Sequence, residues 1–166
     1  MSKIGIYFGS STGNTQDAAE IIAGKLNISS SDIHDVSSAN ADFSDYNVLL
    51  FGSSTWGIGD LQDDWEGFIG KASSTDLNGK KVAIFGCGDS SSYSDSFCDA
   101  IGKIYSAVEG KGCTIIGKIS DEGYSYSTSE AFVDGKLVGL LLDMDNESDK
   151  TEERISSWVN QLKTEM

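Results

Sequence analysis

Short apolar runs alternate with helical patterns along the chain. Three of the runs are continuous, as expected for strands covered on both faces: Ile4–Phe8, Val48–Phe51 and Val82–Phe85. Each is followed by a loop rich in Gly, Ser, Thr and Asp, and then by apolar residues at helical spacing. Shorter runs supply candidates for the second and fifth strands: Ile33–Val36, Thr114–Gly117 and Leu140–Leu142.

Strands that alternate with helices predict a parallel sheet with right-handed crossovers. We therefore expect an α/β fold, a three-layer sandwich in which an open, doubly wound, five-stranded parallel sheet has helices on both faces. Residues 1–166 are expected to form a single domain. Such folds bind ligands at the carboxyl ends of their strands. Loops 9–15, 53–62 and 86–97 follow the three strongest strands and are expected at that edge.

The loop after the first strand reads GSSTGNT and covers residues 9–15. A helix that starts after such a loop presents free backbone N–H groups, which favour an anion. Gly9 and Gly13 allow a sharp turn and a close approach to a ligand. Hydroxyl donors come from Ser10, Ser11, Thr12 and Thr15. The pattern predicts a phosphate monoester held by neutral donors; the alternative is an ordinary turn in which Thr12 or Asn14 caps the helix.

Two other nucleotide-binding loops do not fit this sequence. A nucleoside-triphosphatase loop has a lysine after its second glycine, where Asn14 follows Gly13. A dinucleotide-binding loop needs a third glycine three residues after Gly88, and that position is Ser91. The phosphate predicted here is therefore one that is bound and not transferred.

Each of the next two loops carries one large aromatic residue among small polar ones. Trp56 lies in the stretch 53–61, and Tyr93 lies in the stretch 86–95. Two rings on neighbouring loops are suited to stack on both faces of a flat heteroaromatic group. The alternative is that both rings pack on helices at the solvent edge. Together with the phosphate loop, they favour a ligand with a phosphate at one end and a planar ring system at the other.

On these residues the chain resembles the flavodoxin family. The motifs that carry the resemblance run nearly end to end: Ser10–Thr15, Thr55–Trp65, Gly88–Asp95 and Gly139–Asn146. The resemblance implies the strand order 2-1-3-4-5 and bound flavin mononucleotide (FMN). It also implies that residues of about 118–136 are an insertion that splits the last strand, as in long-chain members.

Position by position, the resemblance also implies a set of FMN-binding residues. The phosphate would be held by Ser10, Ser11, Thr12, Gly13, Asn14 and Thr15. Trp56 and Tyr93 would flank the isoalloxazine ring, and Asp145 would reach the ribityl chain. The remaining cofactor-binding positions are Ser54, Thr55, Gly57, Ile58, Cys87, Gly88, Asp89 and Asp95. Two of them depart from common family choices: many members have proline where Ser54 stands, and small residues other than cysteine are common at Cys87.

The resemblance implies an electron carrier and not an enzyme. FMN would cycle between its neutral semiquinone and anionic hydroquinone, and nearby carboxylates would make the hydroquinone a strong reductant. The carboxylates expected near the ring are those of Asp60, Asp63, Asp89 and Asp95. The implied partners are basic faces of larger redox proteins, such as ferredoxin/flavodoxin-NADP reductase or 2-oxoacid oxidoreductases.

Charge and composition narrow the classes of partner. The net charge is −14, with 26 acidic against 12 basic residues, which suits a basic protein partner and argues against nucleic acid and anionic membranes. No apolar run approaches the ~20 residues that span a bilayer. Since a strand pattern begins almost at the N-terminus, we expect a cytoplasmic protein, and we expect a monomer. Cys87, Cys98 and Cys113 lack metal-ligand spacing, which favours free thiols and no metal site.

Two rival functions follow from similar folds. An FMN enzyme such as a quinone reductase needs a substrate pocket and access for NAD(P)H, whereas Trp56 and Tyr93 would cover the flavin. A phospho-receiver signalling domain needs an acidic cluster after the first strand and an acceptor aspartate after the third. Those places hold Ser10–Thr12 and Ser53–Thr55, which argues against a receiver domain.

Overall fold

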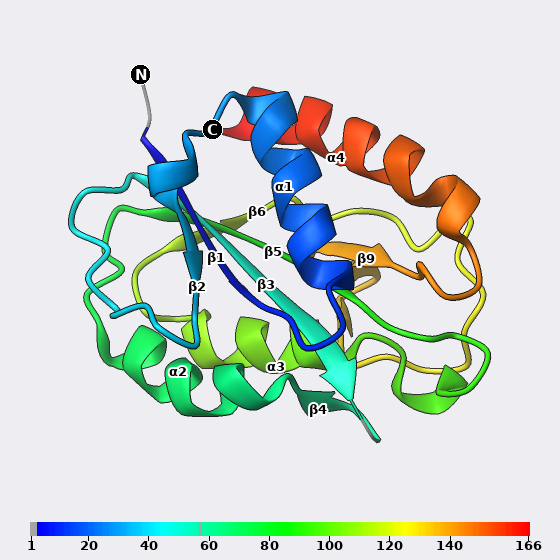
Figure 1. Cartoon of the computed structure of the whole chain (residues 1–166). Coiled ribbons are helices and arrows are strands. Elements are labelled where there is room, and N and C mark those ends of the chain that lie inside the picture. Colours follow the sequence, from blue (N-terminus) through cyan, green and yellow to red (C-terminus); the bar gives the residue numbers. More distant parts are fainter. Residues whose placement is uncertain (1–2, 57) are drawn as a thin grey trace.

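A parallel sheet forms the middle layer of the molecule (Figure 1). The structure, a computed structural model, describes residues 3–56 and 58–166. The main strands are β1 (Ile4–Gly9), β2 (Ile33–Asp35), β3 (Val48–Trp56), β5 (Lys81–Cys87), β6 (Thr114–Ile116) and β9 (Leu140–Leu142). Their order is β2-β1-β3-β5-β6. β9 also pairs with β5, along a later part of that strand than β6 does. With β6 and β9 together as the fifth strand, this is the predicted order 2-1-3-4-5, and the predicted fold class is confirmed.

The last position of the sheet is filled by two short strands in turn. β6 pairs with Lys81–Ala83 of β5, and β9 pairs with Phe85–Cys87 of the same strand. Residues 117–139 leave the sheet between them and include a small antiparallel hairpin of β7 (Phe132–Val133) and β8 (Lys136–Leu137). That this segment is an insertion of the long-chain type stays a prediction, as does the single-domain boundary 1–166.

Two helices cover each face of the sheet (Figure 1). Helices α1 (Asn14–Leu26) and α4 (Thr151–Glu165) pack together on one face. Helices α2 (Asp63–Ser74) and α3 (Asp99–Val108) cover the other. Three single turns of 3₁₀-helix lie in the connections: η1 (Ser30–Asp32), η2 (Ser94–Ser96) and η3 (Ser148–Lys150). A two-residue strand, β4 (Asp60–Leu61), folds back on the end of β3.

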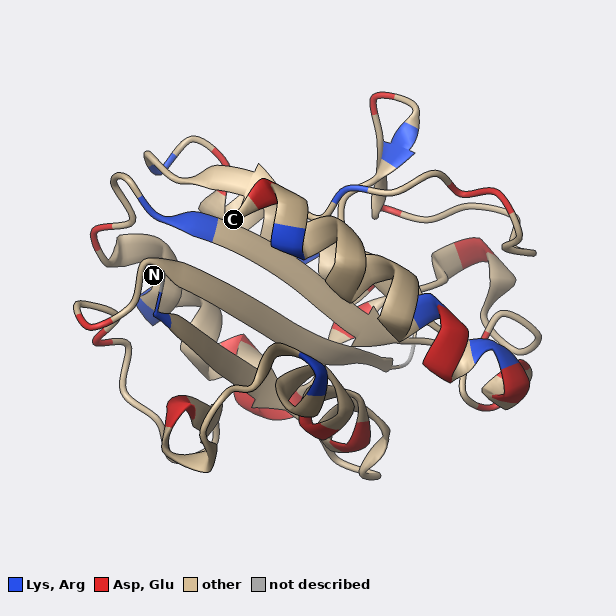
Figure 2. Ribbon diagram, turned by 90° about the horizontal axis from the view of Figure 1, so that it is seen from above, with Lys and Arg blue, Asp and Glu red and all other residues tan. Residues whose placement is uncertain are grey.

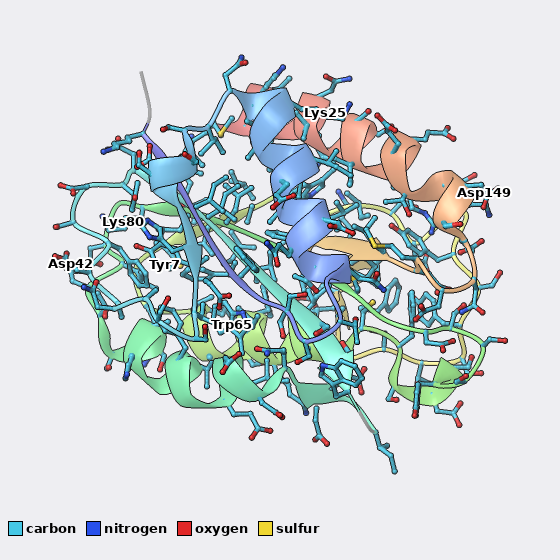
Figure 3. The ribbon with its side chains drawn as sticks, in the orientation of Figure 1. Tyr7, Lys25, Asp42, Trp65, Lys80 and Asp149 are labelled. Atoms are coloured by element: carbon cyan, nitrogen blue, oxygen red, sulfur yellow. The ribbon has the colours of Figure 1, made fainter. Side chains whose placement is uncertain are left out.

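The continuous apolar runs are explained by this two-sided burial. Successive strand residues point to opposite faces, so Ile6 and Phe8 of β1 join the core under α1 and α4, while Tyr7 joins the core under α2 and α3. Trp65 lies between α2 and the sheet (Figure 3), where its indole N–H donates to the Gly52 carbonyl at 2.6 Å. The central strands therefore contribute side chains to the apolar core on each face of the sheet.

The register of the strands brings their carboxyl ends to one edge. Gly9 at the end of β1 pairs with Ser53 of β3, and Ser53 pairs with Gly86 of β5. On the far side of β5, Cys87 pairs with Leu142, the last residue of β9. The loops that follow these four strands therefore emerge side by side. The described residues predicted to bind FMN lie in these loops or in the strand ends and helix starts that adjoin them.

Candidate functional site

Helix α1 begins at the loop after β1 without a side-chain cap. Its N-cap residue is Gly13, whose φ of 99° is in the left-handed region that glycine tolerates. The Gly13 N–H donates to Ser10 Oγ at 3.0 Å, and a Cβ atom at Gly13 would meet nothing within 4 Å. The alternative in which Thr12 or Asn14 caps the helix is thus wrong.

The first backbone N–H groups of α1 have no partner among the described residues. No acceptor in the described part of the chain takes the N–H of Asn14, Thr15 or Gln16, and the first backbone bond of the helix is Asp17 N–H to the Gly13 carbonyl at 2.9 Å. Free N–H groups at the positive end of the helix dipole attract an anion. The loop offers these donors together with the hydroxyls of Ser11 and Thr12, both of which lie on exposed residues.

Thr15 carries a buried hydroxyl with no hydrogen-bond partner. The residue is 0% exposed, and its Oγ1 is one of a few buried side-chain polar atoms without a partner among the described residues. Its hydroxyl offsets part of the rise in the pKa of the neighbouring Cys87 thiol, yet the two groups fall short of hydrogen-bond geometry. A buried polar group left unpaired costs about 1–3 kcal/mol. A ligand oxygen at the start of α1 would give this hydroxyl its partner.

A buried glutamine joins the first loop to the second. Gln62 is 1% exposed and caps α2 by accepting from the Asp64 N–H at 3.0 Å. Its Nε2 donates to Ser11 Oγ at 3.1 Å. Gln62 was not predicted, because glutamine is not among the usual helix-capping residues and its contact with Ser11 joins distant parts of the sequence.

The end of β3 turns into a hairpin that displays the predicted tryptophan. Trp56 pairs with Asp60 of β4, and its side chain is 39% exposed. The indole N–H donates to Ser54 Oγ at 3.1 Å, so Ser54 positions the ring. Ile58 at the turn is 88% exposed. The predicted role of Gly57 falls on a residue outside the described part of the chain.

The loop after β5 is held together by the side chain of Asp89. One carboxylate oxygen of Asp89 accepts from the N–H groups of Ser91 and Ser92 at 3.1 and 3.0 Å, and from the Asn146 amide at 2.8 Å. The Ser92 N–H is the largest of the effects that lower the Asp89 pKa. Tyr93, at the end of this turn, is 45% exposed. The Asp89 side chain therefore fixes the shape of this loop.

The loop after β9 completes the site. Asp143 is fully buried and accepts from Ser90 Oγ and from the Asn146 amide, the latter at 2.9 Å. The Gly88 N–H donates to the Leu142 carbonyl at 2.9 Å, which ties the two loops together. Asp145 is exposed and acts on the pKa of Cys87. Asp143 and Asn146 were not predicted, although both lie in the motif that carried the resemblance.

Cys87 contributes a neutral buried group to the floor of the site. Burial, reinforced by Asp145, Asp143 and Asp17, raises the pKa of its thiol to about 12. A thiol with this pKa is protonated at neutral pH and is a poor nucleophile. Cys87 therefore acts as a small apolar side chain.

Two predicted residues lie at the margin of the site. Thr55 accepts the Ala100 N–H on its Oγ1 at 3.3 Å, so its hydroxyl supports α3. Asp95 lies exposed on η2, and its carbonyl accepts from Thr128 Oγ1 at 2.6 Å.

Within residues 3–56 and 58–166, no cluster of His, Cys, Asp or Glu side chains is arranged to hold a metal ion. In the same ranges, no helix combines the length and apolar character needed to cross a membrane.

Comparisons with known proteins identify the family of the chain. The family model described as Flavodoxin matches residues 6–158. A flavodoxin of Nostoc sp. is 46% identical over 98% of this chain and 96% of its own length. A flavodoxin of Trichodesmium erythraeum is 47% identical over 99% of this chain and 98% of its own. The crystal structure of Fusobacterium nucleatum flavodoxin bound to flavin mononucleotide has a TM-score of 0.92 at 28% identity, covering 100% of this chain and 99% of that one.

Proposed function

Because the chain belongs to the flavodoxin family, we propose that it binds FMN and carries electrons one at a time between larger redox proteins. The observation that carries the proposal is the presence of two unlike features at one edge of the sheet. The first is the uncapped start of α1 with the unpaired Thr15 hydroxyl. The second is the pair of half-exposed rings of Trp56 and Tyr93. These features match a phosphate and a planar ring on one ligand.

The residues present fit FMN, and each has a proposed task. The N–H groups at the start of α1 and the hydroxyls of Ser10–Thr15 bind the phosphate without any lysine or arginine from that loop. Trp56 and Tyr93 stack on the ring and exclude water from it. The backbone groups of Cys87, Gly88 and Asp89 that remain free bind its polar edge, and Asp145 reaches the ribityl chain. Bound FMN supplies the electron-accepting chemistry, which the protein tunes.

The charges around the site oppose added negative charge. Asp60, Asp63 and Asp95 are exposed near the hairpin and the Tyr93 loop, and hydrogen bonds keep the Asp89 carboxylate ionised. Two like charges ~10 Å apart repel by roughly 0.4 kcal/mol in water, before salt screening. Several such charges together make the fully reduced state costly. We therefore infer a low-potential carrier.

The same acidity suits a basic docking partner. Figure 2 shows Asp and Glu on helices and loops around the outline, and basic residues are fewer, 12 against 26. Long-range attraction then speeds encounters with proteins that present a basic face. We propose a reductase or oxidoreductase of the kinds named above as the partner, and we propose that the carrier works in the cytoplasm as a monomer.

The carrier and the enzyme predict different reactions with NAD(P)H. The protein loaded with FMN is expected not to oxidise NADPH by itself, because Trp56 and Tyr93 cover the ring. It should accept electrons at once when a catalytic amount of a flavodoxin-NADP reductase is added, and raised salt should slow that step. The reductase alone, without this protein, is the control. Steady oxidation of NADPH by the protein alone would instead assign it to the FMN enzymes.

A further inference from the structure

A buried carboxylate lies beneath the turn that displays Trp56. Asp99 is the first residue of α3 and is 7% exposed. Gly59 sits against it with a φ of 89°, and a Cβ atom at Gly59 would lie 2.6 Å from Asp99 Oδ2. A side chain at position 59 would be strained by that φ and would also collide with the carboxylate. The turn therefore rests directly on Asp99.

The start of α3 contacts both strands of the hairpin. The Ala100 N–H donates to Thr55 Oγ1 of β3 at 3.3 Å, while Asp99 meets Gly59, the residue before β4. The residue before Asp99 is Cys98, which has a φ of 52°. A left-handed backbone at a non-glycine residue persists only where its surroundings fix it. The position of Asp99 is thus determined by the fold around it.

The other oxygen of Asp99 reaches a third segment. Asp99 Oδ1 accepts from the Glu130 N–H at 2.8 Å. Residues 127–129 run alongside the loop that carries Tyr93: the N–H groups of Ser127 and Thr128 donate to the Ser94 carbonyl at 3.0 and 3.1 Å, and Ser129 Oγ donates to the Phe97 carbonyl. Asp99 therefore contacts two segments: Glu130, which follows the residues packed on the Tyr93 loop, and Gly59 of the Trp56 hairpin.

The charges around Asp99 show why a carboxylate is tolerated there. Burial raises the Asp99 pKa, and the neighbouring Glu130 carboxyl raises it further. The Glu130 N–H and the ammonium of Lys103 act in the opposite direction. Lys103 is paired with Glu130 at 3.0 Å. A buried carboxylate needs hydrogen bonds to offset its desolvation, and the Glu130 N–H supplies one.

We propose that Asp99 is a positioning residue, whose carboxylate packs against Gly59, accepts from the Glu130 N–H and so fixes the Trp56 hairpin before any cofactor binds. The inference rests on the proposed function, because the hairpin matters as the carrier of a stacking ring. It is a property of the protein without FMN, however. It also assigns a structural role to the segment between β6 and β9, whose residues 127–130 contact the Tyr93 loop and Asp99.

The test is amide hydrogen exchange on the protein without FMN. Asp99→Ala removes the contact with Gly59 and the acceptor for the Glu130 N–H. The amides of Gly59, Asp60, Leu61 and Glu130 should therefore exchange at least about tenfold faster relative to core amides of β1. Asp99→Asn keeps an acceptor oxygen and should stay within about threefold of the wild type. Glu109→Ala, which removes an exposed acid just after the same helix, is the control and should leave the ratio unchanged.

Two outcomes would overturn the inference. One is an unchanged ratio of hairpin to core exchange in Asp99→Ala; the other is Asp99→Asn exchanging as fast as Asp99→Ala, which would show that the acceptor for the Glu130 N–H does not hold the hairpin. If Asp99→Ala does not fold, Asp99→Ser replaces it, because serine suits a helix start but is too short to reach Glu130. A second readout is FMN affinity, expected to fall about three- to tenfold in Asp99→Ala. If the wild type takes up no FMN, the proposed function fails while the exchange result still decides the role of Asp99.

Discussion

Replacing Thr15 by valine is expected to weaken FMN binding and to stabilise the protein without FMN at the same time. Valine keeps the shape of the side chain but removes a buried hydroxyl that has no partner. Without ligand, losing an unpaired polar group should raise the free energy of unfolding by about 1 kcal/mol or more. With ligand, the lost bond to a charged phosphate should cost about 1.5–3 kcal/mol, roughly 10- to 150-fold in Kd. Urea unfolding and an FMN titration measure the two effects.

Thr151 provides a matched control for this experiment. It is also buried, its Oγ1 also lacks a partner, and it lies at the start of α4, outside the predicted site. Thr151→Val should therefore stabilise the protein and leave the Kd for FMN unchanged. Two results would contradict this: Thr15→Val destabilises the protein without FMN, or the variant binds FMN as tightly as the wild type. The Thr15 hydroxyl would then not bind the phosphate, and the proposed orientation of the ligand would be wrong.

Removing either aromatic ring should weaken FMN binding with little cost to stability. Trp56 and Tyr93 are 39% and 45% exposed, so each buries only part of its ring in the protein itself. Stacking on a flat heteroaromatic group contributes about 1–3 kcal/mol per ring. Trp56→Ala and Tyr93→Ala should therefore each raise the Kd by roughly 5- to 150-fold. Quenching of flavin fluorescence on binding follows the titration.

An exposed phenylalanine elsewhere controls for the loss of surface area alone. Phe132 is 41% exposed, lies in β7 and is not among the residues predicted to bind FMN. Phe132→Ala should leave FMN affinity unchanged. Should Trp56→Ala and Tyr93→Ala bind FMN like Phe132→Ala, neither ring stacks on the flavin, and the planar part of the ligand lies somewhere else.

Most of the sheet could be predicted from the sequence because burial on both faces leaves a plain signal. Continuous apolar runs mark β1, β3 and β5, and the fold then places their loops at one edge. The candidate site followed from composition: hydroxyls and glycines after one strand, and single rings after the next two. In these places local pattern and tertiary structure agree.

The contacts that hold the loops together could not be predicted, because they join residues far apart in the sequence. Gln62 bonds Ser11 at 3.1 Å, and Asn146 bonds Asp89 at 2.8 Å. Asp99 was not singled out because an acid at a helix start is ordinary. Only the packing of Gly59 against it distinguishes it from other such acids. Asp89 was predicted to face the cofactor, and only the hydrogen bonds show that its side chain is used within the loop.

The most direct test of the account is the absorption spectrum of the purified protein, loaded with FMN, during stepwise anaerobic reduction. We predict one FMN per chain and reduction in two separate one-electron steps, with a spectrally distinct state between them. A single two-electron step would contradict the carrier function. A colourless protein that takes up no added FMN would contradict the site itself, since the Thr15 loop and the two rings would then have no common ligand.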